Sequence, residues 1–294
     1  SSVPRRALCY PSSPRACCFK NQCQNKTIEQ CTCEDCLDLR QRIVAERHHW
    51  YPHSKQCQMT YYDPTSACKM LAEKNVKHII LVGDSLVRHF FGALLILLSG
   101  RMKDGAMLPD TKPGDRDYCG YHLQFDEKYC RLMADRERKI CNSTIQLTLR
   151  EDYKLPLLPN SVEFIREKEN QVILFSTGLH SGFDFPSTKL AVEKYIKALG
   201  DRIFQQNSYT NHTRPRMLFM TPHYPGLMKR ARYLNNHQGP KDVMLYTNKM
   251  RTFLANYSIP TFNTSALTNH TFSFDGTHFG FGLNLQLAHN LLNY

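Results

Sequence analysis

Four short apolar runs between residues 77 and 226 have the pattern of β-strands. Three are stretches rich in Ile, Val, Leu, Phe and Met that lead into a glycine or a Pro-rich loop, as buried parallel strands do: "KHIILVG" (77–83), "NQVILFSTG" (170–178) and "RPRMLFMTPHYPG" (214–226). The fourth, "TIQLTLR" (144–150), alternates between apolar and polar residues, which predicts a strand with one buried face.

Helical patterns separate and follow these runs. In the segment 187–206, Leu190, Tyr195, Ile196 and Leu199 are predicted to share the apolar side of an amphipathic helix. Strands that alternate with helices predict an α/β fold, in which helices cover both faces of a central parallel sheet. The predicted helices are "SLVRHFFGALLILLSG" (85–100), the segment 187–206, "DVMLYTNKMRTFLANY" (242–257) and "FGFGLNLQLAHNLLNY" (279–294).

Two parts of the chain lack this pattern. Residues 1–70 contain nine of the 12 cysteines and little periodic apolar sequence, which predicts a disulfide-stapled cap ahead of a main domain at residues 71–294. Residues 101–141 contain the other three cysteines and predict a stapled insertion in that domain. The aromatic end of the cap, around Trp50, is expected to pack on the main domain.

The cysteines are even in number and confined to the first half of the chain, which predicts disulfides and an oxidising, secretory compartment. Zinc bound by Cys31, Cys33 and Cys36 is the alternative. Six Asn-X-Ser/Thr sequons accompany the cysteines and favour a glycosylated protein of the Golgi lumen or the extracellular space. The sequon asparagines are Asn25, Asn142, Asn211, Asn256, Asn263 and Asn269.

Composition narrows the class of protein. With 294 residues, 41% of them hydrophobic, the chain can bury one sizeable core. No apolar stretch reaches the roughly 20 residues of a membrane span, and a membrane tether ahead of residue 1 stays compatible with the sequence. The net charge of +12 comes from scattered Lys and Arg, which fits no nucleic-acid-binding arm and leaves an acidic glycan as a minor partner class. Without a phosphate-binding glycine loop or a His-Glu-x-x-His motif, we expect neither cofactor nor metal.

Residues able to do chemistry follow the predicted strands. Gly83-Asp84-Ser85 follows the first strand, Gly178-Leu179-His180 another, and Thr221-Pro222-His223 a third. Because parallel strands end at the same edge of their sheet, these loops are expected to converge on one site. There His180 and His223 are expected to contact substrate, with hydrogen-bonded loop histidines as the alternative of equal weight.

Ser85 stands where the first strand passes into the first helix. The unsatisfied N–H groups at a helix start suit two roles for its hydroxyl, an N-cap or a nucleophile whose oxyanion those groups stabilise. A serine nucleophile needs a base. Asp275 and His278, three residues apart before the last helix, can supply a base and the carboxylate that orients it. Together these residues predict a Ser-His-Asp triad.

The motifs "GDS" (83–85) and "DGTH" (275–278) resemble those of the SGNH, or GDSL-type, hydrolase superfamily. An arginine three residues after the serine, Arg88, and the segment "VILFSTGLH" (172–180) are similar, more narrowly, to its PC-esterase branch. That branch includes the lumenal domain of a sialic acid O-acetyltransferase and the plant trichome-birefringence-like polysaccharide O-acetyltransferases. The resemblance implies a flavodoxin-like three-layer α/β/α fold for the main domain.

The resemblance also implies roles for single residues. Ser85 would be the nucleophile, His278 the general base and Asp275 its orienting partner. The Ser85 amide and Arg88 would donate hydrogen bonds to the oxyanion. The superfamily's Gly-x-Asn-Asp block is absent from this chain, and the Gly178-Leu179-His180 loop stands where its Asn would be.

The reaction implied is acyl transfer through an acyl-serine intermediate. The first hypothesis is a carbohydrate O-acetyltransferase, with a glycan or polysaccharide as acceptor and an acyl donor such as acetyl-CoA or another acetyl ester. The second is an acetylesterase that acts on glycans or lipids, in which water is the acceptor. A third, of another class, is a catalytically silent extracellular binding module, which would have no need of all three triad residues.

Overall fold

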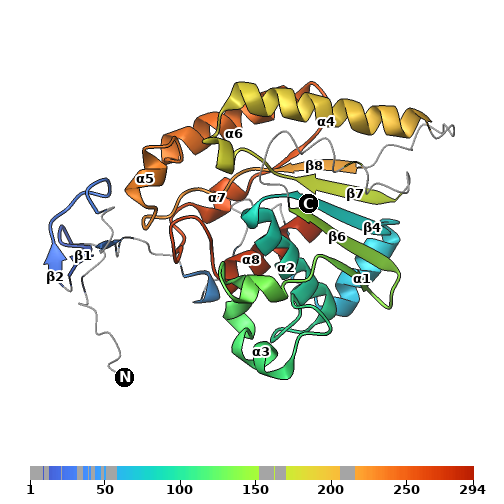
Figure 1. Cartoon of the computed structure of the whole chain (residues 1–294), viewed down its shortest axis with the longest axis horizontal. Coiled ribbons are helices and arrows are strands. Elements are labelled where there is room, and N and C mark those ends of the chain that lie inside the picture. Colours follow the sequence, from blue (N-terminus) through green and yellow to red (C-terminus); the bar gives the residue numbers. More distant parts are fainter. Residues whose placement is uncertain are drawn as a thin grey trace.

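The computed structural model describes residues 9, 13–20, 22–31, 36–38, 40, 44–47, 50, 58–151, 162, 170–205 and 216–294. The central element among them is a six-stranded sheet (Figure 1). Its strands are parallel apart from β5, which joins the edge antiparallel to β6. In spatial order they are β5 (Glu137–Ile140), β6 (Ile145–Glu151), β4 (His78–Gly83), β7 (Gln171–Phe175), β8 (Arg216–Met220) and β9 (Thr261–Phe262).

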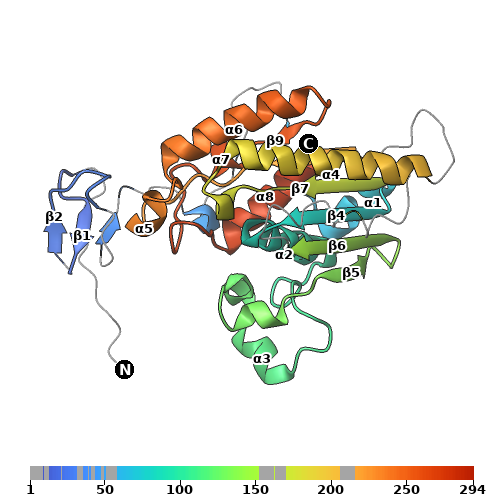
Figure 2. The same ribbon diagram turned by 45° about the horizontal axis from the view of Figure 1, so that its top comes forward.

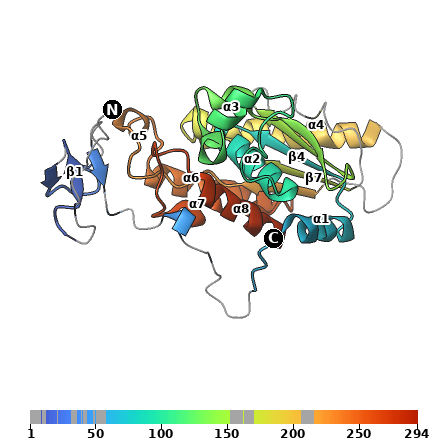
Figure 3. The same cartoon turned by 90° about the horizontal axis from the view of Figure 1, so that it is seen from below.

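The parallel strands confirm the predicted fold class. Numbered along the chain, their spatial order is second, first, third, fourth, fifth, which is the flavodoxin-like order. Helices α4 and α6 cover one face of the sheet, and α1, α2 and α8 cover the other (Figures 1 and 2). Seen from below, α8 runs beside α2 (Figure 3). The bounds are α1 (Pro64–Glu73), α2 (Ser85–Ser99), α4 (Phe185–Gln205), α6 (Pro240–Ala255) and α8 (Phe281–Asn293).

Helix α2 is the centre of the core. It is buried from Ser85 to Leu98, between the sheet and the helices α1 and α8, because its sequence is apolar around almost its whole circumference. It ends where Gly100 takes the left-handed conformation, at φ 68°, which glycine adopts without a steric cost.

The apolar side of α4 differs from the prediction at one position. Tyr195 and Leu199 are buried as expected, but Leu190 is 54% exposed and Val192 lies in the core instead. A helix turns by about 100° per residue, so Leu190 points about 200° away from Val192. The stripe that faces the sheet therefore runs through positions 192, 195 and 199.

The insertion is stapled, but not by its own three cysteines alone. Cys119 bonds Cys130, whereas Cys141 bonds Cys68 in α1. The strand of this insertion, β5, was not predicted because its sequence, "ERKI", is mostly charged, as the sequences of edge strands often are. Its other elements are short: α3 (Pro113–Tyr118), η2 (Tyr121–Phe125) and η3 (Cys130–Met133).

The N-terminal part forms a small antiparallel sheet next to α5 at one end of the molecule (Figures 1 and 2). Its disulfides are Cys9–Cys23 and Cys17–Cys31, so Cys31 is not available to zinc; Cys33 lies outside the described residues. The predicted boundary at residue 70 falls inside α1, whose Ala67 and Leu71 belong to the main core. The strands are β1 (Cys17–Phe19), β2 (Gln22–Gln24) and β3 (Cys36–Asp38).

One short element of the N-terminal part fastens it to the main domain. In η1 (Ala45–Arg47), Glu46 Oε1 accepts a hydrogen bond of 3.0 Å from the Gly282 N–H at the start of α8. A Cβ on Gly282 would lie 2.6 Å from the Glu46 nitrogen, so only glycine permits this approach.

The disulfides indicate an oxidising compartment. Four are present among the described residues, and such bonds persist in secreted and lumenal proteins. Among the helices of the described segments, none combines the length and the apolar character that crossing a membrane requires.

Candidate active site

The candidate catalytic residues lie at the carboxyl edge of the sheet, beside the adjacent strands β4 and β7. The next parallel strand in the chain after β4 is β6, on one side of this pair, whereas the next after β7 is β8, on the other side. Connections of this kind leave a crevice between the loops that follow the two strands. The remaining elements near this edge are η5 (Leu179–Ser181), α5 (Ala231–Leu234) and α7 (Thr264–Thr268).

Ser85 is the first residue of α2, and Asp84 is the N-cap: Asp84 Oδ1 accepts a hydrogen bond of 3.0 Å from the Leu86 N–H. The alternative that Ser85 merely caps the helix is therefore wrong, and its hydroxyl is free for another partner. Gly83 makes the turn possible, because a Cβ there would lie 2.7 Å from the Ser176 carbonyl oxygen. Burial raises the pKa of Asp84.

Ser85, His278 and Asp275 form a continuous hydrogen-bonded chain. Ser85 Oγ lies 2.7 Å from His278 Nε2, and His278 Nδ1 lies 2.7 Å from Asp275 Oδ2. A carboxylate only accepts, so Nδ1 carries the ring proton of the neutral histidine and Nε2 accepts from the serine hydroxyl. The ring is thus in the tautomer that a general base requires.

The loop before α8 holds this geometry through local bonds. Asp275 Oδ1 accepts from the N–H groups of Thr277 and His278, each at 2.7 Å. Partial burial would raise the pKa of Asp275, but its hydrogen bonds to His278 and to these backbone groups lower it, so the carboxylate stays ionised. Gly276 has φ +80°, and its carbonyl accepts from the Gly226 N–H at 2.9 Å.

A buried lysine braces the same loop. Lys229 is 3% exposed, and its Nζ donates to Thr277 Oγ1 at 2.6 Å. Burial lowers the pKa of Lys229 to about 8, partly offset by the charges of Asp275 and Asp84. No pattern in the sequence marks this residue.

Two further residues that the sequence did not reveal lie beside His278. His89 Nε2 lies 2.5 Å from Glu127 Oε1, and the same oxygen lies 3.8 Å from His278 Nε2. Burial lowers the pKa of His89 to about 4, so the ring is neutral near pH 7 and donates through Nε2. His89 follows Ser85 by four positions on α2, a spacing that places both on one helix face and that could have signalled it. Glu127 has no such signal.

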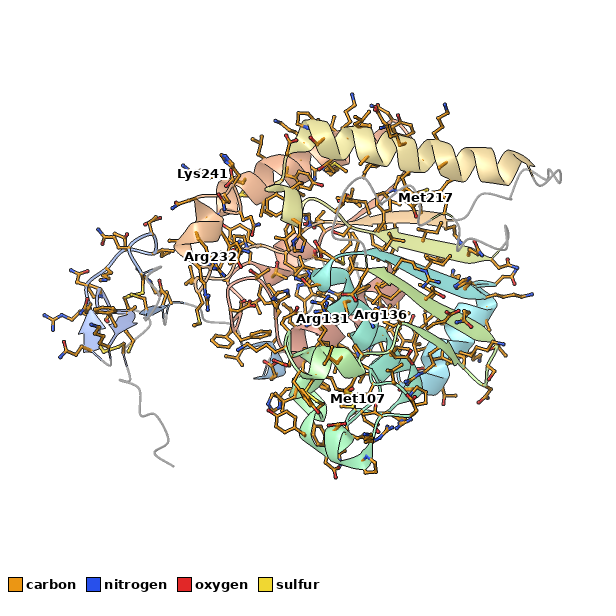
Figure 4. All side chains as sticks on the ribbon, viewed as in Figure 1. Met107, Arg131, Arg136, Met217, Arg232 and Lys241 are labelled. Atoms are coloured by element: carbon orange, nitrogen blue, oxygen red, sulfur yellow. A yellow bond between two sulfur atoms is a disulfide. The ribbon has the colours of Figure 1, made fainter. Side chains whose placement is uncertain are left out.

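Arg88 lies near the site, where its side chain is paired with carboxylates. Its guanidinium forms ion pairs with Glu127 and, at 2.6 Å, with Glu151. Arg131 and Arg136, labelled in Figure 4, bind the same Glu151 at 3.1 and 2.6 Å. Each terminal nitrogen of Arg88 thus binds a carboxylate, and the expected oxyanion role stays a prediction. Ser85, as the first helical residue, keeps an N–H without an acceptor inside the helix.

The loops after β7 and β8 place their histidines differently. His223 is 5% exposed, and neither ring nitrogen has a partner among the described residues. Burial lowers the pKa of His223 to about 3. His180, in contrast, is exposed on η5.

Gly178 lies against a buried tyrosine, since a Cβ there would lie 2.5 Å from Tyr246 Oη. His223 lines a small cavity together with Leu86, Leu179, Lys229, Gln238 and Thr277.

The sequon asparagines are distributed over the surface. Asn25, Asn142, Asn256 and Asn263 are exposed, and Asn269 is partly exposed. Asn211 lies outside the described residues. Glycosylation at these positions stays a prediction.

No protein-family model and no curated protein matches the sequence. Solved structures similar to it include Est24, a carbohydrate acetylesterase from Sinorhizobium meliloti, at 12% identity and a TM-score of 0.40, over 74% of this chain and 96% of that one. The aryl esterase of M. smegmatis is 14% identical, with a TM-score of 0.42, over 74% of this chain and 97% of that one. A lipolytic protein of the G-D-S-L family from Veillonella parvula is 12% identical, with a TM-score of 0.38 over 74% and 97%.

Proposed function

We propose that the protein transfers acyl groups, with Ser85 as the nucleophile, His278 as the general base and Asp275 as the carboxylate that orients it. The single observation that carries this proposal is the pair of 2.7 Å hydrogen bonds that join Ser85, at the start of α2, to His278 and His278 to Asp275. This arrangement supplies the two things that a serine nucleophile lacks by itself, a base within reach and nearby amide donors for the developing oxyanion.

The reaction proceeds by double displacement. Ser85 Oγ attacks the carbonyl carbon of an acetyl ester and gives its proton to His278 Nε2. The tetrahedral oxyanion collapses, the alcohol or thiol of the donor leaves with that proton, and acetyl-Ser85 remains. An acceptor hydroxyl then attacks the acyl carbon while its proton passes to Nε2, and Ser85 Oγ leaves and recovers the proton.

For the acceptor we propose a hydroxyl of a glycan or polysaccharide, which makes the protein a carbohydrate O-acetyltransferase of the Golgi lumen or the extracellular space. The resemblance of "GDS" followed by Arg88, and of "VILFSTGLH" (172–180), to the PC-esterase branch supports a carbohydrate substrate. The donor would be acetyl-CoA or another acetyl ester, with no resident cofactor. With water as the acceptor, the same site would be an acetylesterase.

The decisive experiment captures the intermediate. Incubation with p-nitrophenyl acetate and acid quenching should leave one acetyl group on Ser85, found by peptide mass. Ser85→Ala should abolish both the adduct and the turnover while near-UV circular dichroism stays unchanged. A folded Ser85→Ala protein with wild-type turnover would refute the assignment. Product analysis with and without added polyol acceptors separates the transferase from the esterase.

A further inference from the structure

A second carboxylate lies beside the base of the site. Glu127 belongs to the insertion, between η2 and η3, and its Oε1 lies 3.8 Å from His278 Nε2, the nitrogen that faces Ser85. That separation is too long for a hydrogen bond, so Glu127 does not compete with Ser85 for the base. The carboxylate instead borders the place where an acceptor hydroxyl must deliver its proton.

One oxygen of Glu127 is held firmly. Oε1 binds both His89 Nε2 and Arg88, and these two side chains are themselves 3% and 4% exposed. Arg88 is further fixed by Glu151. A flexible side chain normally loses rotamer entropy when it binds a ligand. Because these bonds already order Glu127, most of that cost does not arise on binding.

The other oxygen is available. Oε2 receives no hydrogen bond from any residue that the structure describes, and the Glu127 side chain remains 23% exposed. Burial opposes ionisation, but the hydrogen bond from His89 and the charges around it hold the pKa of Glu127 far below its usual range. The result is a positioned, anionic hydrogen-bond acceptor next to the reacting atoms.

We propose that Glu127 Oε2 binds a second hydroxyl of the acyl acceptor and so selects acceptors that carry a hydroxyl next to the one that is acylated. This inference rests on the proposed acyl transfer. The attacking hydroxyl must come within hydrogen-bond reach of His278 Nε2. A hydroxyl on the neighbouring carbon is then within reach of the carboxylate that borders the same nitrogen. Charge-assisted bonds of this kind are stronger than neutral ones and strengthen selection of the diol.

The test measures how acetyl-Ser85 divides between water and an added acceptor. p-Nitrophenyl acetate is the donor, and the acceptors are trans-1,2-cyclohexanediol and cyclohexanol, which share one ring and differ by one hydroxyl. The diol offers two hydroxyls, so chance alone gives it a twofold advantage. For the wild type we expect the ratio of transfer to hydrolysis to favour the diol by about tenfold or more, as a hydrogen bond to a charged group implies.

Two variants and a control locate the preference. Glu127→Asp keeps the charge beside Arg88 but withdraws the carboxylate by one methylene, and Glu127→Gln removes the charge. Both should lower the diol preference toward twofold while hydrolysis of p-nitrophenyl acetate in water remains measurable. Asp117→Asn, at a carboxylate of the same insertion whose side chain is 71% exposed, should leave both quantities unchanged.

The outcomes separate this inference from the proposed function. If the wild type hydrolyses p-nitrophenyl acetate through Ser85 but shows no diol preference beyond twofold, Glu127 does not select the acceptor. A preference that survives in both Glu127 variants overturns the inference equally. If neither variant folds, the wild-type ratio decides: a preference above twofold supports selection of a diol at this site, and a preference of twofold or less overturns it. If Ser85-dependent turnover is absent altogether, the proposed function fails first and the inference falls with it.

Discussion

Two loops bring a carboxylate to His278, and they do so by different means. The loop 273–280 carries Asp275 within three residues of the histidine, and Asp275 Oδ2 bonds Nδ1 at 2.7 Å. Glu127 comes from the insertion, far earlier in the chain, and remains 3.8 Å from Nε2. The first contact is built by local backbone geometry, the second by the closure of the whole domain.

The difference suggests a division of work between the two loops. In the proposed mechanism, Asp275 decides where the proton of the imidazole sits and therefore acts on the chemistry itself. Glu127 is anionic, pairs with Arg88 and accepts a hydrogen bond from the neutral His89 through one oxygen, and it offers its second oxygen to the surroundings. Substitutions in the Asp275 loop should therefore stop acyl transfer, whereas substitutions in the Glu127 loop should change which acceptors are used.

The largest expected effect comes from Asp275→Asn. The asparagine Oδ1 can keep the backbone bonds, but its amide NH₂ would face Nδ1 and force the proton to Nε2, where it blocks acceptance from Ser85. We expect kcat for p-nitrophenyl acetate to fall on the order of 10³–10⁴-fold. Glu127→Gln measured in parallel should retain far more activity, and equal losses in the two variants would contradict the division of work.

The next prediction tests whether the loop 273–280 depends on the backbone conformation of Gly276. Gly276→Ala places a Cβ 1.9 Å from the Lys229 nitrogen at a φ of +80°, so the backbone must move. We expect the free energy of unfolding to fall by about 3 kcal/mol, measured by urea denaturation, together with most of the activity.

Gly114→Ala is the matched control for this substitution. No atom lies within 4 Å of a Cβ at Gly114, so both stability and activity should stay close to those of the wild type. Equal stability of the two alanine variants would show that the loop tolerates a side chain at Gly276.

A smaller effect is expected from removing the disulfide that closes the Glu127 loop. The Cys119–Cys130 disulfide closes a segment with a sequence separation of 11 residues that contains Glu127. Replacing both cysteines by serine should lower the free energy of unfolding by about 2–3 kcal/mol. Hydrolysis of p-nitrophenyl acetate should persist, while the preference for a diol acceptor declines. Loss of hydrolysis in a folded variant would mean that the insertion supports the triad directly.

The smallest effect concerns His223, which belongs to neither loop. Its folded-state pKa of about 3 lies below the ordinary value, so the unfolded chain binds more protons between about pH 6.5 and 3. Stability should therefore fall as the pH falls through this window. His223→Phe should reduce the slope by about 1 kcal/mol per pH unit between pH 6 and 4, followed by urea midpoints. An unchanged slope would show that His223 is protonated in the folded protein.

The site could be predicted only in part. Ser85, His278 and Asp275 were recognisable because each stands at a position that secondary structure defines: the end of a strand, the start of a helix and a three-residue turn. For Arg88 the sequence predicted a hydrogen bond to the oxyanion and gave no sign of its carboxylate partners. Its ion pairs with Glu127 and Glu151 join segments that no local pattern connects.

The fold shows the same limit. The apolar runs predicted β4, β6, β7 and β8, whereas the charged edge strand β5 carried no apolar signal. Leu190 was assigned to the wrong side of α4 because several helical stripes fit its sequence, and only contact with the sheet selects one. The Cys68–Cys141 disulfide joins segments that spacing alone does not pair.

By itself, the sequence determined the alternation of strands and helices, the turn that places Ser85 at the start of α2, and the Asp-x-x-His turn, since each depends on backbone preferences within a few residues. Only the tertiary structure decided that Glu127 and His89 border His278, that Arg88 is held by two carboxylates, and that His223 is buried. These contacts depend on distances between segments far apart in the chain, which exist only once the sheet and its helices have closed around the site.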